Sequence, residues 1–307
     1  MKERDFLAIS DLTSKEIFAL FKRAKELKKK FHAGQKLEQT LKGKNLALIF
    51  EKPSTRTRVS FEVGMEQLGG HAIFLSAGDS HLGRGEPIED TARILSRYVD
   101  GIVIRTYSHE AVETLAQFAT IPVINALTDL LHPCQALADL FTIQEQFGDF
   151  KKMPLVYVGD GNNVCHSWIM AAAHLGVPLQ IACPKNYGPS SRLLERVRKT
   201  TGYVPTLLDD AVEAVRGAKI VYTDVWVSMG QEAELKKLRA LEYFQVNGEL
   251  LKHAAPNVKV MHCLPAHRGE EISMDVFEKH SALIFEQAEN RLHVQKALME
   301  KLLADEK

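Results

Sequence analysis

Apolar runs of strand length alternate with helix-like stretches along the first half of the chain. The strand-like runs cover residues 46–50, 72–75, 101–104 and 121–124. Helices are predicted over residues 14–31, from Ser54 onward, and over residues 89–98, 109–118 and 136–147, with Asp11 and Ser14 as candidate caps of the first. This alternation is typical of a parallel sheet covered by helices. We therefore expect an α/β domain over residues 1–150, with residues 125–135 as a loop.

A second alternation of the same kind begins near Lys151. Its strand-like runs cover residues 155–158, 179–182, 220–223 and 258–261, with helices between them, and residues 288–303 are predicted to form a last helix. We expect a second α/β domain over residues 151–287. Ligands in such sheets bind at the carboxyl ends of strands, so polar residues that follow each strand are the candidates for chemistry.

Composition restricts the class of partner. The 307 residues are 45% hydrophobic, which is normal for a chain with sizeable cores. The 39 lysines and arginines balance 39 aspartates and glutamates, so net charge favours neither nucleic acid nor a membrane surface as partner. The four cysteines include no C-x-x-C pair, and the charged N-terminus resembles no signal peptide. We expect a cytoplasmic protein.

The stretch after the first strand predicts an anion site. Pro53 sets the backbone for a helix start, and Ser54 is a good cap. The amides that open a helix have no backbone partners, so they attract anions together with nearby hydroxyl and guanidinium donors. The donors here are the side chains of Ser54, Thr55, Arg56 and Thr57. A tetrahedral oxyanion such as a phosphate fits this set.

An ordinary capped helix is the alternative for this stretch. In that case Arg58 would pair with Glu62 one turn later on a solvated face. Capping alone does not require three hydroxyls and two arginines in one turn, which favours the anion site. Arg56 and Arg58 are separated by roughly 200° of rotation on a helix, so one phosphate does not face both. We choose Arg56 as the ligand.

Further polar groups follow the later strands of the first domain. Arg105 ends one strand and offers a long cationic donor. His132 and Gln135 flank Pro133 and Cys134, and an imidazole beside an amide can polarise a carbonyl and hold a neighbouring amide. Each of these residues alone is more often a surface or turn residue. Together with the anion site, they suit a phosphate attached to an activated carbonyl.

The second domain offers groups suited to an amino acid. Asn163 lies in residues 159–164, which depart from the dinucleotide pattern G-x-G-x-x-G at the last position. Asp224 and Ser228 could hold an ammonium and a carboxylate, although a capped turn around a buried tryptophan is the alternative. Cys263 could interact with a reacting amine. The histidines and cysteines lack metal-ligand spacing, so no metal is expected.

Four motifs resemble the ornithine carbamoyltransferase family. They are Ser54-Thr55-Arg56-Thr57-Arg58, His132-Pro133-Cys134-Gln135, Asp224-Val225-Trp226-Val227-Ser228-Met229-Gly230 and His262-Cys263-Leu264-Pro265. Their order and spacing match the family across nearly the whole chain. The first two are shared with aspartate carbamoyltransferases and specify carbamoyl phosphate, whereas the last two are characteristic of the ornithine branch.

The resemblance implies a carbamoyl-phosphate-binding domain, to which residues 288–307 return, and an ornithine-binding domain, each with a parallel sheet flanked by helices. Carbamoyl phosphate would contact Ser54, Thr55, Arg56, Thr57, Arg105, His132, Pro133, Cys134, Gln135, Cys263, Leu264, Arg291 and His81, the last from a neighbouring subunit. Ornithine would contact Asn163, Asp224, Ser228 and Met229. The catalytic residues would be Arg105, His132 and Cys263. The family implies a homotrimer or a higher assembly of trimers, with no metal or organic cofactor.

The implied reaction is attack by the neutral δ-amine of L-ornithine on the carbamoyl carbon, which gives L-citrulline and phosphate. Cys263, oriented by Asp224, is one candidate acceptor of the amine's proton, and the leaving phosphate is the other. Putrescine, N-acetylornithine and aspartate are the alternative amines, and Asp224 with Ser228 argues against the first two. A non-catalytic metabolite sensor is the alternative from another class. The sequence leaves open whether the reaction serves arginine synthesis or breakdown.

Overall fold

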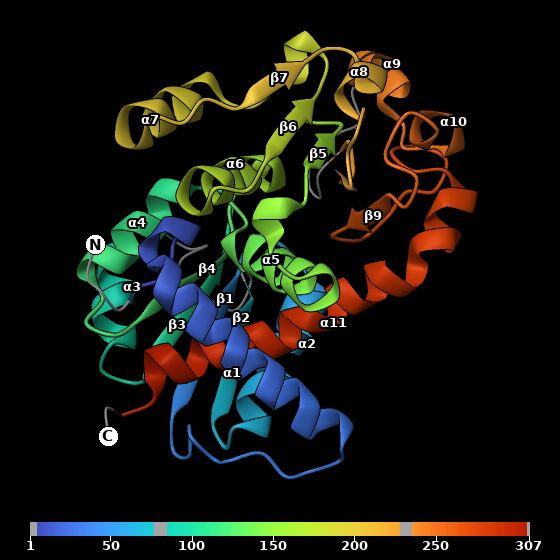
Figure 1. Ribbon diagram of the computed structural model, residues 1–307. Helices are drawn as coiled ribbons and strands as arrows, with labels where there is room; N and C mark the ends of the chain where they lie inside the picture. Colours follow the sequence, from blue (N-terminus) through green and yellow to red (C-terminus); the bar gives the residue numbers. More distant parts are fainter. Residues whose placement is uncertain (1–4, 77–84, 228–234, 306–307) are drawn as a thin grey trace. The chain divides into compact units, whose positions relative to one another are not determined.

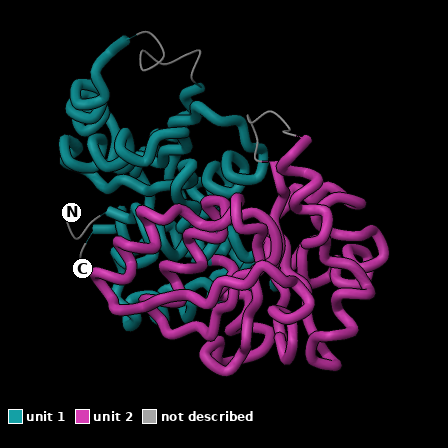
Figure 2. Tube along the Cα trace, turned by 90° about the horizontal axis from the view of Figure 1, so that it is seen from above, with its two compact units in different colours: residues 1–137, 290–307 teal, residues 138–289 magenta. Residues whose placement is uncertain are grey.

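The computed structural model describes residues 5–76, 85–227 and 235–305. Backbone contacts divide the chain into two compact units (Figure 2). Unit 1 comprises residues 1–137 and 290–307, and unit 2 comprises residues 138–289. Both boundaries fall inside helices, namely α5 (Pro133–Phe147) and α11 (Met274–Leu303). Among the described residues, no helix combines the length and the apolarity needed to cross a membrane.

Unit 1 is built on a parallel sheet with helices packed on it (Figure 1). Its described strands are β1 (Asn45–Phe50), β2 (His71–Ser76), β3 (Gly101–Arg105) and β4 (Val123–Leu127), in the order β2-β1-β3-β4. The helices are α1 (Ser14–His32), α2 (Thr55–Gln67), α3 (Ile88–Leu95) and α4 (His109–Phe118), after the 3-10 turn η1 (Ile9–Asp11). Because β1 lies between β2 and β3, the direction of strand addition reverses between β1 and β3.

Unit 2 repeats this plan with a parallel sheet in the order β7-β6-β5-β8-β9. Its described strands are β5 (Leu155–Val158), β6 (Leu179–Ala182), β7 (Thr206–Leu208), β8 (Ile220–Thr223) and β9 (Lys259–His262). The helices are α6 (Asn163–Leu175), α7 (Ser191–Thr201), α8 (Ala211–Ala214), α9 (Leu235–Leu241) and α10 (Gly248–Leu251), with 3-10 turns η3 (Phe150–Lys152), η4 (Lys185–Tyr187) and η5 (Glu242–Phe244). Here the reversal falls between β5 and β8.

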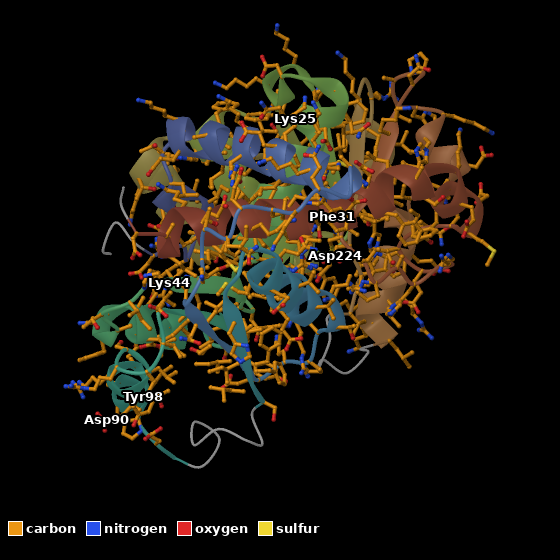
Figure 3. The ribbon with its side chains drawn as sticks, turned by 90° about the horizontal axis from the view of Figure 1, so that it is seen from below. Lys25, Phe31, Lys44, Asp90, Tyr98 and Asp224 are labelled. Carbon is orange, nitrogen blue, oxygen red and sulfur yellow. The ribbon has the colours of Figure 1, made fainter. Side chains whose placement is uncertain are left out.

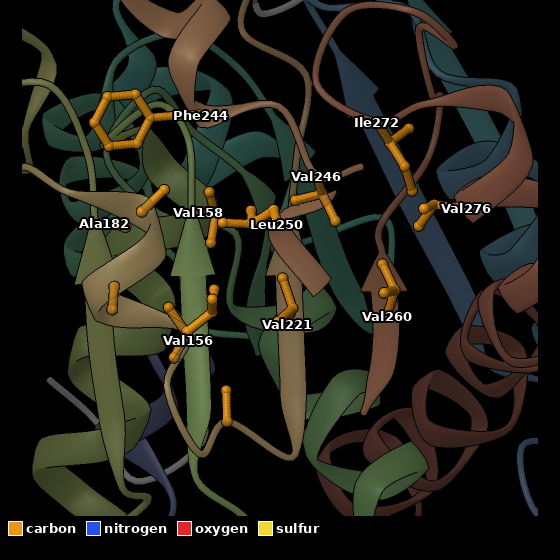
Figure 4. Close-up of a cluster of buried hydrophobic side chains, with 14 of the residues drawn as sticks. Val156, Val158, Ala182, Val221, Phe244, Val246, Leu250, Val260, Ile272 and Val276 are labelled. Carbon is orange, nitrogen blue, oxygen red and sulfur yellow. The ribbon is translucent and has the colours of Figure 1, made fainter. Parts of the chain in front are cut away.

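The core of unit 2 shows why these apolar runs become strands. Val156 and Val158 from β5, Val221 from β8 and Val260 from β9 belong to one buried cluster, which Ile272 joins (Figure 4). β-branched side chains fit the pleated surface of a strand, and strands buried on both faces read as nearly continuous apolar runs. Such apolar runs are the feature from which these strands were predicted.

The predicted architecture of two helix-flanked parallel sheets is confirmed. Three strands of unit 2 have the predicted bounds, at residues 155–158, 179–182 and 220–223. The prediction missed β7, a three-residue strand in which two residues are exposed, because its apolar run consists of Leu207 and Leu208 alone and is shorter than an ordinary strand.

The cap of one helix and the starts of two others differ from the prediction. The cap of α1 is Thr13, which forms a reciprocal capping box with Glu16, and not Asp11 or Ser14. Helix α5 begins at Pro133, so the predicted loop over residues 125–135 ends three residues early. Proline suits the first position of a helix, where the backbone nitrogen needs no hydrogen-bond partner. Helix α11 begins at Met274, well before residue 288.

The C-terminal half of α11 belongs to unit 1, as expected for residues 288–307. Lys28 Nζ on α1 donates to Asn290 Oδ1 at 2.8 Å, and this lysine is 7% exposed. Lys296 Nζ donates to Gln67 Oε1 on α2 at 2.7 Å. These buried and half-buried contacts hold the last turns of the chain beside α1 and α2.

Candidate active site

Each unit has a polar cluster at the place where strand addition reverses, which is where open α/β sheets bind ligands. The unit 1 cluster consists of Ser54, Thr55, Arg56, Thr57, Arg105, His132, Gln135 and Arg291, around the ends of β1 and β3. The unit 2 cluster consists of Asn162, Asn163, Asp224, Cys263 and Leu264, around the ends of β5, β8 and β9.

The start of α2 forms one side of the unit 1 cluster. Ser54 is the cap, and its Oγ accepts a hydrogen bond from the Thr57 amide at 3.2 Å. The guanidinium of Arg58 is held away from this end, because its Nε donates to Glu62 Oε1 at 2.9 Å. Arg56 lies exposed in the first turn, where helix amides and the helix dipole favour an anion. The Arg58–Glu62 pair that the capped-helix alternative predicts is therefore present, and the assignment of Arg56 as the anion ligand stays a prediction.

Two buried arginines complete the positive side of the cluster. Arg105 ends β3, is 5% exposed and donates from Nε to the Lys52 carbonyl at 3.2 Å. Arg291 reaches from α11 and donates from Nη2 to Thr57 Oγ1 at 2.9 Å. Burial, and then the charges of Arg291 and Arg56, lower the pKa of Arg105 to about 10. Cations gathered at such close quarters favour the binding of an anion.

His132 lies directly before α5 and is 6% exposed. Burial lowers the pKa of His132 well below its ordinary value, and the charges of Arg291, Arg105 and Arg56 lower it further. The imidazole is therefore neutral near pH 7, and a neutral imidazole N–H can donate to a carbonyl oxygen without adding a buried charge. Gln135 lies in the first turn of α5, where its backbone N–H donates to the His132 backbone carbonyl at 3.1 Å.

The thiol of Cys134 faces the core of unit 1. It is 1% exposed, and its Sγ donates to the Asn125 carbonyl at 3.4 Å. Burial raises the pKa of Cys134 to about 12. This thiol is therefore no nucleophile near neutral pH.

In the unit 2 cluster, Asn162 organises the loop after β5. Its Oδ1 accepts from the amides of Val164 and Cys165 at 2.9 and 3.2 Å, which caps α6. Its Nδ2 donates to Asp224 Oδ2 at 2.7 Å, directly after β8. Asn163 was the residue predicted from the sequence, and Asn162 was missed. The cap position before a helix was the signal that could have found it.

Gly159 and Gly161 are required by the backbone conformation and the packing of this loop. Gly159 has φ +128°, which L side chains rarely adopt. A Cβ on Gly161 would lie 2.2 Å from the Gly188 carbonyl carbon, so only glycine fits against that turn. Both glycines thus have structural reasons that involve no nucleotide.

Cys263 follows β9 and donates its Sγ–H to Asp224 Oδ1 at 2.8 Å. Burial raises the pKa of Cys263 well above its ordinary value, and the charge of Asp224 raises it further. The group is therefore a protonated thiol near pH 7, and it donates a hydrogen bond. A thiol that already carries its proton is a poor acceptor for another, which favours a different base for the amine.

The backbone after Cys263 adopts an uncommon conformation. Leu264 has φ +59°, in the left-handed region that costs an L residue roughly 1–2 kcal/mol. Its amide donates to His262 Nδ1 at 2.9 Å, so His262 carries its proton on Nε2 and donates to the buried Glu271 Oε1 at 3.0 Å. Strain of this kind is common at functional sites.

Asp224, His262 and Cys263 offer ligand atoms within 4.8 Å of one another, close enough to hold a metal ion. Each is already engaged in the structure: both ring nitrogens of His262 have protein partners, and the thiol donates to the carboxylate. A metal would have to displace these hydrogen bonds. Ser228 and Met229, predicted to bind ornithine, lie outside the described residues, as does His81.

Family models match both halves of the chain. One is described as aspartate/ornithine carbamoyltransferase, carbamoyl-P binding domain, and matches residues 4–145. The other is the Asp/Orn binding domain of the same enzymes and matches residues 151–302. The chain belongs to the aspartate/ornithine carbamoyltransferase family.

Full-length relatives lie within the ornithine branch of this family. An ornithine carbamoyltransferase of Syntrophus aciditrophicus is 54% identical over 302 residues, 98% of this chain and 100% of that protein. An anabolic ornithine carbamoyltransferase of Pyrococcus furiosus is 52% identical over 300 residues, 96% of this chain and 95% of that protein. The solved ornithine carbamoyltransferase structure from P. furiosus superposes with a TM-score of 0.92 at 50% identity, covering 99% of this chain and 98% of that one.

Membership in the family places the two clusters in context. The unit 1 cluster lies within the segment matched by the carbamoyl-P binding model, apart from Arg291 on α11. The unit 2 cluster lies within the segment matched by the Asp/Orn binding model. Side-chain interactions join Arg105, His132 and Arg291 in unit 1 and Asn162, Asp224 and Cys263 in unit 2. The roles predicted for the site residues stay predictions.

Proposed function

We propose that the chain transfers the carbamoyl group of carbamoyl phosphate to the δ-amine of L-ornithine, giving L-citrulline and phosphate. The observation that carries this proposal is the occurrence of a buried arginine–histidine cluster and the Asp224–Cys263 pair in one chain that is over 50% identical, along its whole length, to ornithine carbamoyltransferases. The anabolic name of the P. furiosus relative supports arginine biosynthesis as the direction.

Residues 1–150 with 288–307 would bind carbamoyl phosphate. The start of α2, with Ser54, Thr55, Arg56 and Thr57, would hold the phosphate, because its free amides and the guanidinium suit a tetrahedral oxyanion. Arg105, His132 and Gln135 would polarise the carbamoyl carbonyl, and Arg291 would add a further donor. As the amine attacks, negative charge develops on that oxygen, and prearranged donors stabilise it there.

Residues 151–287 would bind ornithine. Asp224 would accept from the α-ammonium, with Asn163, Ser228 and Met229 contacting the rest of the amino-acid group. Asn162 would hold Asp224 in place through its hydrogen bond of 2.7 Å. The Cys263 side chain and the Leu264 carbonyl would meet the δ-amine and the carbamoyl amide.

The proton of the δ-amine would leave with the phosphate. Cys263 enters the reaction as a protonated thiol, since its pKa is raised by burial and by Asp224. The departing phosphate is a base generated where the attacking nitrogen releases its proton, and the proton that the ammonium form of ornithine loses before attack goes to solvent. Cys263 remains in our proposal as a catalytic residue that orients the amine by hydrogen bonding.

The family's assembly would be a homotrimer, with His81 reaching a neighbouring site. Supporting this, unit 1 exposes apolar side chains on α2 and on β2, which is an edge strand of its sheet: Val59, Val63 and Ile73 are 48%, 36% and 40% exposed. A second copy could cover such a surface. We also propose a cytoplasmic location, because the four cysteines are buried and form no disulfide.

An amine panel tests the proposed substrate. The protein is incubated with carbamoyl phosphate and, in turn, L-ornithine, putrescine, N-acetylornithine and L-aspartate, and phosphate release is followed. We expect the highest kcat/KM with ornithine, since it alone of the four combines a free α-ammonium and an α-carboxylate with a second amine that can be carbamoylated. A higher kcat/KM with another amine would replace our substrate, and binding of carbamoyl phosphate without turnover of any amine would favour the metabolite sensor.

A further inference from the structure

A second buried polar cluster lies behind Asp224 and Cys263. It consists of Asp139, Tyr222 and Gln287, each fully buried. Tyr222 Oη donates to Asp139 Oδ2 at 2.9 Å, and Gln287 Nε2 donates to Asp139 Oδ1 at 2.7 Å. Gln287 Oε1 accepts from the His262 amide at 3.0 Å. A carboxylate this deeply buried is costly unless it is well paired, and here donors reach both of its oxygens.

This cluster connects helices to the two strand ends that carry the site. Asp139 lies on α5 and Gln287 on α11, the two helices within which the unit boundaries fall. Tyr222 is on β8, two residues before Asp224 (labelled in Figure 3). The His262 amide that Gln287 holds immediately precedes Cys263. The hydrogen bonds of Asp139 and Gln287 therefore reach Tyr222 and the His262 backbone, which lie next to Asp224 and Cys263 in the chain.

The orientation of each group in the cluster is fixed by its neighbour. The Gln287 oxygen must face the His262 N–H, so its NH₂ faces Asp139. Asp139 accepts from that NH₂ and from the Tyr222 hydroxyl. Tyr222 in turn lies close enough to Cys263 to affect the thiol, and Tyr157 stacks on its ring with centroids 5.8 Å apart. A change at Asp139 should therefore reach Cys263 through both strands.

We propose that Asp139 and Gln287 are positioning residues for the carbamoyl transfer: they hold the ends of β8 and β9 so that the Cys263 thiol remains directed at Asp224. The reaction that they serve is the proposed function above. Neither residue touches the substrates in this account.

The first test is Asp139→Asn. The new NH₂ faces either Gln287 Nε2, which is a donor, or the Tyr222 hydroxyl, which would have to stop donating to residue 139 and accept instead. If the new NH₂ faces Gln287, the glutamine must turn over, and its own NH₂ then meets the His262 N–H. An unsatisfied buried group costs on the order of 1–3 kcal/mol, so we expect kcat to fall about 5- to 150-fold. The KM for carbamoyl phosphate should stay within about 2-fold.

The double variant Asp139→Asn with Gln287→Glu restores the three shortest donor–acceptor pairs of the cluster and loses only the longer hydrogen bond from Gln287 Nε2 to Tyr222 Oη at 3.2 Å. The asparagine oxygen accepts from Tyr222, its NH₂ donates to the new carboxylate, and that carboxylate accepts from the His262 N–H. We expect the double variant to recover most of the lost kcat. Tyr222→Phe, which removes one hydroxyl and leaves both partners, is the milder variant if Asp139→Asn does not fold, with an expected loss of about 3- to 10-fold.

Thr142→Val is the matched control. Thr142 is fully buried one turn along α5, and its hydroxyl donates to the Ala138 carbonyl within the same helix. This variant should lower the melting temperature without changing kcat per folded enzyme. If Asp139→Asn behaves in the same way, the cluster is structural only and the proposal is wrong.

A readout independent of turnover separates this inference from the proposed function. Alkylation of Cys263 by iodoacetamide is followed by peptide mass spectrometry across pH. The Asp139 charge disfavours the thiolate, so its removal should shift the alkylation profile to lower pH, and the double variant should shift it back. A profile unchanged by Asp139→Asn would refute the coupling, even if the wild-type protein formed no citrulline.

Discussion

Replacing Asp224 with asparagine removes a charge and changes little in shape. Both carboxylate oxygens accept hydrogen bonds, Oδ1 from the Cys263 thiol and Oδ2 from Asn162 Nδ2. Asn162 cannot turn to match an amide, because its Oδ1 already accepts from backbone amides at the start of α6. The new NH₂ therefore faces Cys263, and the thiol must rotate away.

The expected cost follows from the lost charge. Asp224 is 6% exposed, so solvent screens its interaction with an ammonium only weakly. A hydrogen bond to a charged group contributes about 1.5–3 kcal/mol, which corresponds to a loss of roughly 10- to 150-fold in kcat/KM for ornithine. Carbamoyl phosphate contacts proposed in unit 1 are untouched, so its KM should change less than about 2-fold.

Initial rates of citrulline formation, with each substrate varied in turn, measure both quantities. Asp209→Asn is the control: the same substitution at an exposed carboxylate of unit 2, which pairs with Lys185 at 2.9 Å. We expect no change there. A kcat/KM for ornithine within about 3-fold of wild type in Asp224→Asn would refute the assignment of Asp224 to the α-ammonium.

The remaining predictions concern both clusters. Arg56→Gln should raise the KM for carbamoyl phosphate about 10- to 100-fold, whereas Arg58→Gln should leave it unchanged because that guanidinium is already paired on the helix. Cys263→Ala should lower kcat about 10-fold with little effect on carbamoyl phosphate binding. Cys183→Ala, which changes a buried cysteine at another strand end, should leave kcat unchanged. An unchanged kcat in Cys263→Ala would remove Cys263 from the mechanism. The lowered pKa of His132 contributes stability that is fully present above the unfolded pKa of about 6.5 and is lost as pH falls from there toward the folded pKa. His132→Gln should therefore show a smaller drop in urea midpoint between pH 7.5 and 5.5 than wild type, and equal drops would contradict this.

Sequence reasoning located the elements and groups whose signals are local. The capped helix start at Ser54 depends on a strand, a cap and a helix within ten residues, so it could be predicted from local sequence, and the anion expected there stays a prediction. The separation of Arg56 from Arg58 needed only the rotation per residue. The strand ends that carry Arg105, Asp224 and Cys263 followed from apolar runs.

Residues that act through distant partners could not be predicted in this way. Asp139 and Gln287 are 148 positions apart, and each looks like an ordinary polar position on a helix until the fold brings them together. The protonation state of Cys263 likewise depends on burial and on a carboxylate 39 positions away. Pro133 was placed in the loop over residues 125–135, whereas it begins α5, a position that suits proline.

The most direct test of carbamoyl transfer to ornithine follows the atoms that are transferred. Carbamoyl phosphate labelled with ¹³C at the carbonyl is incubated with the protein and L-ornithine labelled with ¹⁵N at the δ-amine, and the product is observed by NMR. We predict a new ureido carbon signal split by one-bond coupling to ¹⁵N, with one phosphate released per citrulline. A carbon signal without that coupling, or carbamoyl phosphate consumed only at its spontaneous rate, would contradict carbamoyl transfer to the δ-amine.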